Sequence, residues 1–178
     1  MPVEKSAGAI IFRRENDKIY YLSLHYPPSA TRAAAKGQEE GLSSLPTRAA
    51  AKGQEEGLPS SPKTPKEYWD LPKGHIEKGE KEIETVRREV EEETGLKDIE
   101  FLEGFKEWIK YFFKFRGKNI LKFVTFYLAE TKEKDIKVSF EHLGFEWLSY
   151  EKAIKKLTFK NAKEILKKAN DYLVKHET

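Results

Sequence analysis

Three glutamates with helical spacing stand in the segment GHIEKGEKEIETVRREVEEETGL, which runs from Gly74 to Leu96. At about 100° per residue, Glu89, Glu92 and Glu93 fall on one face of a helix. Carboxylates three and four residues apart repel one another, so we expect a cation to neutralise them. Oxygen ligands select a hard divalent ion, Mg²⁺ or Mn²⁺. The pattern therefore indicates a metal site, although a solvated acidic helix has a similar composition.

The remaining residues of this segment indicate how the helix is held. Ile83, Val86 and Val90 form an apolar stripe that can be buried beside the glutamates. A loop bracketed by glycines, residues 74–79, is predicted before the helix, and Gly95 supplies a C-terminal stop. The segment is thus predicted to fold as loop, helix and loop.

The spacing of the glycines, the arginine and the glutamates also matches a known motif. The motif is G-x5-E-x7-R-E-U-x-E-E-x-G-U, where U is aliphatic, and its fixed positions are filled by Gly74, Glu80, Arg88, Glu89, Val90, Glu92, Glu93, Gly95 and Leu96. The segment resembles the Nudix box, and the chain is identified as a member of the Nudix hydrolase family. The resemblance implies hydrolysis of a nucleoside diphosphate linked to another group, assisted by a divalent cation, Mg²⁺ or Mn²⁺.

The resemblance also implies a role for each matching residue. The metal ligands would be the Gly74 carbonyl and the carboxylates of Glu89, Glu92 and Glu93, joined by Glu141 from outside the box. Arg88 would orient glutamates by ion pairing, Glu80 included. Cations that bridge phosphate oxygens offset transition-state charge and acidify a bound water, so no protein nucleophile is required. A glutamate near that water would act as general base, and its identity stays open.

The run WDLPKGHIEKGE, from Trp69 to Glu80, narrows the substrate class. It resembles the asymmetrical diadenosine tetraphosphate hydrolases, as do the segments SAGAIIFRR and FVTFYLAE. The resemblance implies cleavage of diadenosine tetraphosphate to ATP and AMP. Diphosphoinositol polyphosphate hydrolases share much of PKGH, so another Nudix diphosphatase acting on those compounds, capped RNA ends or modified nucleoside triphosphates stays open. A non-catalytic nucleotide-binding Nudix domain is a further alternative.

Residues outside the box are implied to bind this substrate. They match positions that contact polyphosphate or base, namely Tyr26, Lys73, His75, Tyr111, Lys122 and Phe159. Tyr111 and Phe159 match an aromatic pair that sandwiches a base, with phenylalanine where tyrosine is familiar. Stacking requires only a π-face, so the substitution keeps that role. Aromatic residues alternating with lysines around Tyr111 are equally typical of a half-buried strand.

The elements that must position these residues follow from hydrophobic periodicity. Strands are predicted at residues 6–14, 18–25, 99–115, 118–131 and 144–148, and helices after the box at 152–157 and 161–174. Together with the box helix, this order predicts an α/β fold. It agrees with the Nudix-type α/β/α sandwich around a mixed β-sheet.

One segment, at about residues 29–66, breaks this order. TRAAAKGQEEGL occurs at residues 31–42 and again at 47–58, in a stretch with few large apolar side chains. Such a stretch cannot bury enough surface to offset the entropy of ordering it. We predict a low-complexity insertion in a single domain that spans 1–178. The insertion is either a tolerated duplication or a lid or partner-binding segment.

Composition sets limits on compartment and partners. The chain has no cysteine, which excludes disulfides and cysteine nucleophiles. Neither a membrane span of about 18 apolar residues nor a signal-peptide core is present, which predicts a soluble, cytoplasmic protein. With 33 basic and 30 acidic residues, the net charge of +3 is too small to argue for nucleic-acid binding. Nucleic acid is not an expected partner, with the exception of RNA 5' ends. The expected partner is a small-molecule dinucleoside polyphosphate, and the expected state is a monomer.

Overall fold

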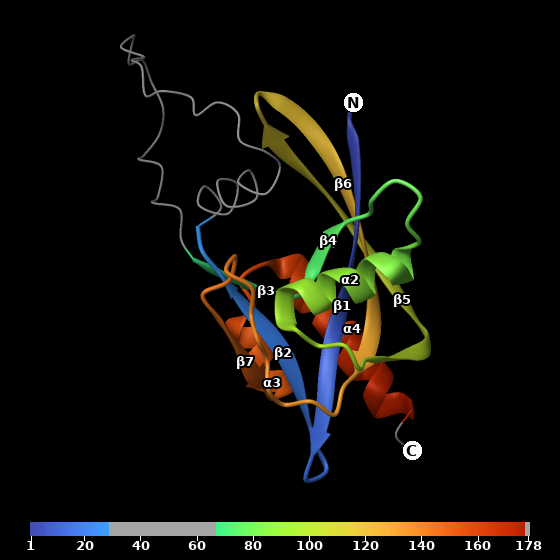
Figure 1. Ribbon diagram of the computed structural model, residues 1–178, viewed down its shortest axis with the longest axis vertical. Helices are drawn as coiled ribbons and strands as arrows, with labels where there is room; N and C mark the ends of the chain where they lie inside the picture. Colours follow the sequence, from blue (N-terminus) through green and yellow to red (C-terminus); the bar gives the residue numbers. More distant parts are fainter. Residues whose placement is uncertain (29–66, 177–178) are drawn as a thin grey trace.

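The computed structural model describes residues 1–28 and 67–176, and the predicted insertion lies outside the described residues (Figure 1). A seven-stranded mixed sheet has the strand order β3-β2-β1-β6-β5, with β4 paired to β1 and β7 paired to β2. The strands are β1 (Val3–Glu15), β2 (Lys18–Tyr26), β3 (Tyr68–Asp70), β4 (Lys73–His75), β5 (Glu100–Phe115), β6 (Lys118–Glu130) and β7 (Gly144–Leu148). The helices are α2 (Glu82–Thr94), α3 (Tyr150–Lys156) and α4 (Lys160–His176).

The helices form a layer on each face of the sheet (Figure 1). In the central strand β1, Ile10 and Phe12 belong to the core beneath α3 and α4, whereas Ala9 and Ile11 belong to the core beneath α2. Successive side chains of a strand point to opposite faces, so this apolar run fits a strand covered on both sides. The predicted α/β/α sandwich is confirmed.

Strands β1 and β2 diverge, and the two shortest strands fill the gap between them. Strand β2 pairs with β1 only at residues 12–15, and β4 takes its place along residues 6–8. The amide of Ala9 donates a 3.1 Å hydrogen bond to the carbonyl of Pro72. A Cβ atom at Gly8 would lie 2.5 Å from that carbonyl oxygen, so the close approach requires glycine. This contact fixes the start of the box against the central strand.

The long elements lie within three residues of their predicted bounds, but two strands were not predicted. Strands β3 and β4 have three residues each, too few to show a period of two. The prediction that Gly74 lies in a loop is wrong, because Gly74 is the middle residue of β4. Within the described ranges, the structure holds no helix long and apolar enough to cross a membrane.

Candidate active site

Helix α2 presents the box carboxylates because its two ends and its buried face are fixed. At the start, the Glu84 carboxylate accepts a 2.8 Å hydrogen bond from the amide of Lys81. At the end, Gly95 adopts a left-handed conformation with φ of 73°, which glycine tolerates at no steric cost. Val86 and Val90 are fully buried against the sheet. The helix therefore cannot rotate about its axis without exposing this apolar stripe.

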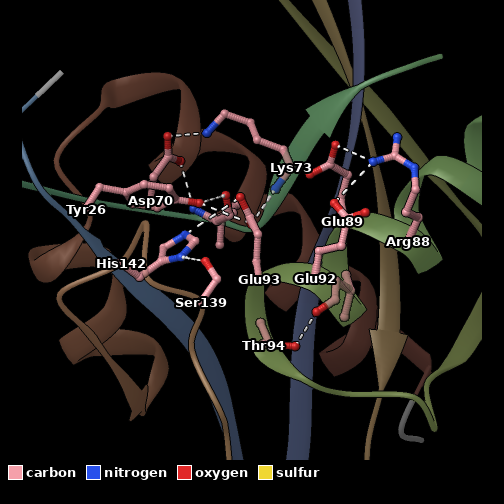
Figure 2. Close-up of polar contacts among 12 residues, drawn as sticks. Tyr26, Asp70, Lys73, Arg88, Glu89, Glu92, Glu93, Thr94, Ser139 and His142 are labelled. Carbon is pink, nitrogen blue, oxygen red and sulfur yellow. Dashed lines mark hydrogen bonds and ion pairs between the residues drawn. The ribbon is translucent and has the colours of Figure 1, made fainter. Parts of the chain in front are cut away.

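Arg88 connects the carboxylates of Glu80, Glu89 and Glu92, and Figure 2 shows its contacts with Glu89 and Glu92. Its Nε and Nη2 atoms donate to the two carboxylate oxygens of Glu80 at 2.8 and 2.9 Å. Its Nη1 atom lies 2.9 Å from Glu89 Oε1 and 3.3 Å from Glu92 Oε2. Nη2 also donates to the carbonyl of His75 at 3.0 Å. One guanidinium thus ties the helix to β4.

The pKa values of two box glutamates are shifted in opposite directions. The hydrogen bonds from Arg88 lower the pKa of Glu80 to about 2, so this carboxylate stays charged in any physiological buffer. Partial burial, and then the negative charge of Glu89, raise the pKa of Glu92. The structure therefore holds Glu80 as a fixed anion and makes Glu92 the carboxylate more ready to accept a proton.

Gly74 lies directly against the carboxylate of Glu89. A Cβ atom placed on Gly74 would fall 1.8 Å from the carboxylate carbon of Glu89, and Glu89 itself is only 6% exposed. Any larger side chain at this position would displace the carboxylate. The contact explains why a glycine is needed in β4 itself.

Glu93 lies one turn further along α2 than Glu89, in a different environment (Figure 2). Its Oε2 atom accepts hydrogen bonds from the amide of Lys73 at 3.2 Å and the hydroxyl of Tyr26 at 3.4 Å. His142 Nε2 lies 3.7 Å from Glu93 Oε1, and the other ring nitrogen of His142 is 2.9 Å from the Ser139 hydroxyl. Glu93 therefore depends on residues from distant parts of the chain.

Two of these neighbours differ from what the sequence suggested. Tyr26, expected to contact substrate, is fully buried and stacks in parallel on Tyr68 at 5.0 Å between ring centroids. In this position its hydroxyl donates to Glu93, and the predicted contact with substrate stays a prediction. No local sequence pattern pointed to His142, which reaches Glu93 only through the tertiary fold. Glu141, the further predicted metal ligand, lies half-buried in the same turn as His142.

The donor atoms suit a hard cation, but they are divided between two groups. Glu89, Glu92 and Glu93 offer only oxygen, which is the chemistry that Mg²⁺ and Mn²⁺ prefer. Glu89 and Glu92 face Arg88, whereas Glu93 faces Tyr26 and His142 (Figure 2). Across residues 1–28 and 67–176, no three carboxylates or imidazoles lie close enough together to form a ready-made metal site. An ion at these residues would draw the two groups together.

The predicted phosphate-binding cations lie on β4 and β6. The ammonium of Lys73 forms an ion pair with Asp70. His75 Nε2 lies 3.0 Å from Glu4 Oε2, and the ammonium of Lys122 lies 3.8 Å from the same oxygen. In the sheet register, Lys122 is opposite Glu4 on β1 and opposite Tyr111 on β5. Lys122 and Tyr111 thus lie on the paired strands β6 and β5, and β1 separates these strands from His75 on β4.

Of the two residues predicted to bind a base, Tyr111 lies in the sheet and Phe159 does not. Tyr111 is partly buried and packs against the core beneath α3 and α4. Phe159 precedes α4, is 46% exposed, and packs edge-on against Tyr68 at 5.3 Å. The sandwich of a base between the two rings stays a prediction.

A cavity of about 320 Å³ lies beside the first turn of α2. Its walls include Lys5, Glu82, Trp108 and Phe123, and none of the predicted substrate-binding residues lines it. The hydrogen bonds to Glu82 from Tyr127 at 2.7 Å and Thr125 at 3.3 Å close one wall. This cavity is therefore separate from the box carboxylates that Arg88 gathers.

Comparisons with known proteins agree with the geometry. Residues 54–169 match the family model described as the NUDIX domain. The chain is 34% identical over 110 residues to the asymmetrical bis(5'-nucleosyl)-tetraphosphatase of Mus musculus, covering 60% of this chain and 72% of that protein. It is 30% identical over 176 residues to the protein of the same name from Caenorhabditis elegans, covering 96% and 97%. The solved binary complex of a C. elegans Ap4A hydrolase aligns with a TM-score of 0.66 at 25% identity, covering 97% of this chain and 98% of that one.

Proposed function

The chain belongs to the Nudix hydrolase family, and on this premise we propose that it cleaves diadenosine tetraphosphate asymmetrically, to ATP and AMP. Nudix hydrolases generally use divalent metal ions. The observation that carries the proposal is the position of β4. Its Gly74 lies against Glu89, and its flanking residues Lys73 and His75 carry the cations implied to bind polyphosphate. One short strand thus joins a carboxylate group to a phosphate-binding group.

The residues of the chain would divide the chemistry as follows. A divalent ion bound by Glu89, Glu92 and Glu93 would neutralise phosphate charge and make a water molecule more acidic. Arg88 holds Glu89 in position against β4, so this carboxylate does not need to reorganise during the reaction. A box glutamate would accept the proton of the attacking water.

The phosphate-binding and base-binding residues would determine which bond is broken. Lys122 and His75 would hold the phosphate chain, while Tyr111 and Phe159 would hold one adenine. The reacting phosphorus would then lie at a set number of phosphates from the bound base, because Tyr111 and Lys122 lie opposite each other on β5 and β6. Cleavage away from the centre of the phosphate chain would yield ATP and AMP, whereas cleavage at the centre would yield two ADP.

The test is product analysis with diadenosine tetraphosphate in isotopically labelled water. We expect ATP and AMP, with the label on AMP if water attacks the phosphorus nearest the departing adenosine. Glu92→Gln should lower kcat about a thousandfold, equivalent to about 4 kcal/mol of transition-state stabilisation. Glu91→Gln is the matched control, because Glu91 is the adjacent exposed carboxylate and pairs with Lys97 at 3.6 Å.

Three results would contradict the proposal or the residue roles within it. Formation of two ADP would refute the asymmetric geometry. If the enzyme cleaves diphosphoinositol polyphosphates or RNA 5' ends but not dinucleotides, the family assignment would stand and this substrate assignment would be refuted. Equal activity of Glu92→Gln and the wild-type protein would exclude Glu92 from the reaction.

A further inference from the structure

A carboxylate on β1 lies between two side chains implied to bind phosphate, the imidazole of His75 and the ammonium of Lys122. Glu4 Oε2 is 3.0 Å from His75 Nε2 and 3.8 Å from Lys122 Nζ, so a single oxygen contacts both groups. The three side chains come from three adjacent strands, because β1 pairs with β4 on one side and with β6 on the other. Their convergence is therefore built into the sheet.

The exposure of the three side chains shows which of them faces solvent. The Lys122 side chain is 15% exposed, that of Glu4 is 31% exposed, and that of His75 is 52% exposed. The ammonium of Lys122 also lies 6.0 Å from the ring of Phe113, which shields it further. The Glu4 carboxylate is thus more accessible to solvent than Lys122, with which it pairs. A phosphate that binds Lys122 would have to share this place with the carboxylate.

We infer that Glu4 is an internal counter-ion that occupies a phosphate position between His75 and Lys122, so that a substrate must displace it. The inference rests on the proposed function, because that proposal assigns the two side chains to the phosphate chain. A carboxylate oxygen and a phosphate oxygen accept from the same donors, and both cannot hold one position. Glu4 therefore competes with the substrate instead of contacting it favourably.

This competition would select substrates by charge. A chain with more phosphates carries more negative charge, so it gains more from the two side chains and displaces Glu4 more readily. A chain with fewer phosphates gains less and is rejected. Glu4 would act as a specificity-determining residue for phosphate-chain length.

The test is Glu4→Gln, which keeps the shape of the side chain and removes its charge. We expect the KM for diadenosine tetraphosphate to fall about fivefold to tenfold while kcat stays within about twofold. The kcat/KM for diadenosine triphosphate should rise more than that for the tetraphosphate. Glu4→Asp keeps the charge and should retain the wild-type preference.

Calorimetric titration with inorganic tripolyphosphate separates this inference from the proposed function. The probe carries no nucleoside, so tighter binding to Glu4→Gln would support the counter-ion even if the protein does not cleave diadenosine tetraphosphate. Glu107→Gln is the matched control, because it changes net charge equally and removes a 2.7 Å pair with Lys168 instead. Its tripolyphosphate affinity and its KM should stay close to those of the wild-type protein.

Three results would overturn the inference. A higher KM or weaker tripolyphosphate binding in Glu4→Gln would show that Glu4 positions the two side chains for the substrate. Unchanged values would show that Glu4 does not compete with phosphate. An equal gain in Glu107→Gln would assign the effect to net charge rather than to this position.

Discussion

Two neighbouring turns of α2 hold their carboxylates by different means. In the first group, Arg88 donates charged hydrogen bonds to Glu80 and Glu89, and all three residues belong to the same short segment. In the second group, Glu93 accepts from a backbone amide and a phenol, and the imidazole of His142 lies at 3.7 Å. Charge is balanced locally in the first group, whereas the second group depends on tertiary packing. The two groups should therefore respond differently to mutation and to pH.

Among the variants that compare the two groups of carboxylates, Gly74→Ala should produce the largest loss, because it acts on the group that Arg88 organises. The new Cβ atom would lie 1.8 Å from the Glu89 carboxylate, which must move. Displacing a reacting group by about 1 Å can cost about a hundredfold in rate, so kcat should fall by at least this factor. Steady-state kinetics at saturating Mg²⁺ measures the effect.

Gly79→Ala is the control for strain in the same segment. Gly79 has a φ of 85° and no neighbouring atom within 4 Å of the added Cβ, so the substitution strains only the backbone. This should cost about 1–2 kcal/mol of stability and lower Tm while leaving kcat within a few-fold. Equal losses of kcat in both variants would mean that displacement of Glu89 is not the cause.

Low pH should weaken the Arg88 group through Glu80. The pKa of Glu80 is about 2 in the folded protein, against an ordinary value of 4.5. The unfolded chain therefore takes up the proton first as the pH falls, so the stability from this pair is present above about pH 4.5 and is lost towards pH 2. Glu80→Gln should lower Tm at neutral pH, and its difference from wild type should shrink across this window. Thermal melts of the metal-free proteins test this, and a constant difference would contradict it.

Tyr26→Phe should have the smallest effect and reports on the Glu93 group. The variant keeps the buried ring and loses two long hydrogen bonds, to Glu93 at 3.4 Å and to the Leu71 carbonyl at 3.3 Å. We expect a loss of about 1 kcal/mol in the free energy of unfolding, measured with urea, and a kcat within a few-fold of wild type. A hundredfold loss of kcat would instead support the substrate contact that the sequence suggested for Tyr26.

The same division explains how far the sequence could predict this molecule. Helix α4 shows periodic burial and β1 is a continuous buried run, as expected of a helix with one buried face and of a strand covered on both faces, so their positions and the sandwich could be predicted from pattern alone. The group around Arg88 could also be predicted, because Glu80 and Glu89 are close to Arg88 along the chain. Strands β3 and β4 are too short to show a period, and their pairing depends on the divergence of β1 and β2.

The neighbours of Glu93 and the position of Glu4 could not be predicted for a different reason. His142 is 49 residues from Glu93 along the chain, and Lys122 is 118 residues from Glu4. Strand alternation places Glu4 and Ser6 on one face of β1, but the register of β1 against β6 is a property of the folded sheet. A pattern read along one strand carries no information on which residue lies opposite.

The parallel pairing of β1 with β6 also constrains how the protein can fold. Val3 lies opposite Leu121, and Phe12 lies opposite Glu130, so the central pair of the sheet closes over a large separation in sequence. Such contacts form slowly, because closing the long loop costs conformational entropy before the contacts stabilise the fold. During synthesis, β1 must wait until residues up to Glu130 have left the ribosome before it gains this neighbour. The apolar run of β1 is therefore exposed for much of translation, and chaperone binding to this strand in nascent chains would reveal that delay.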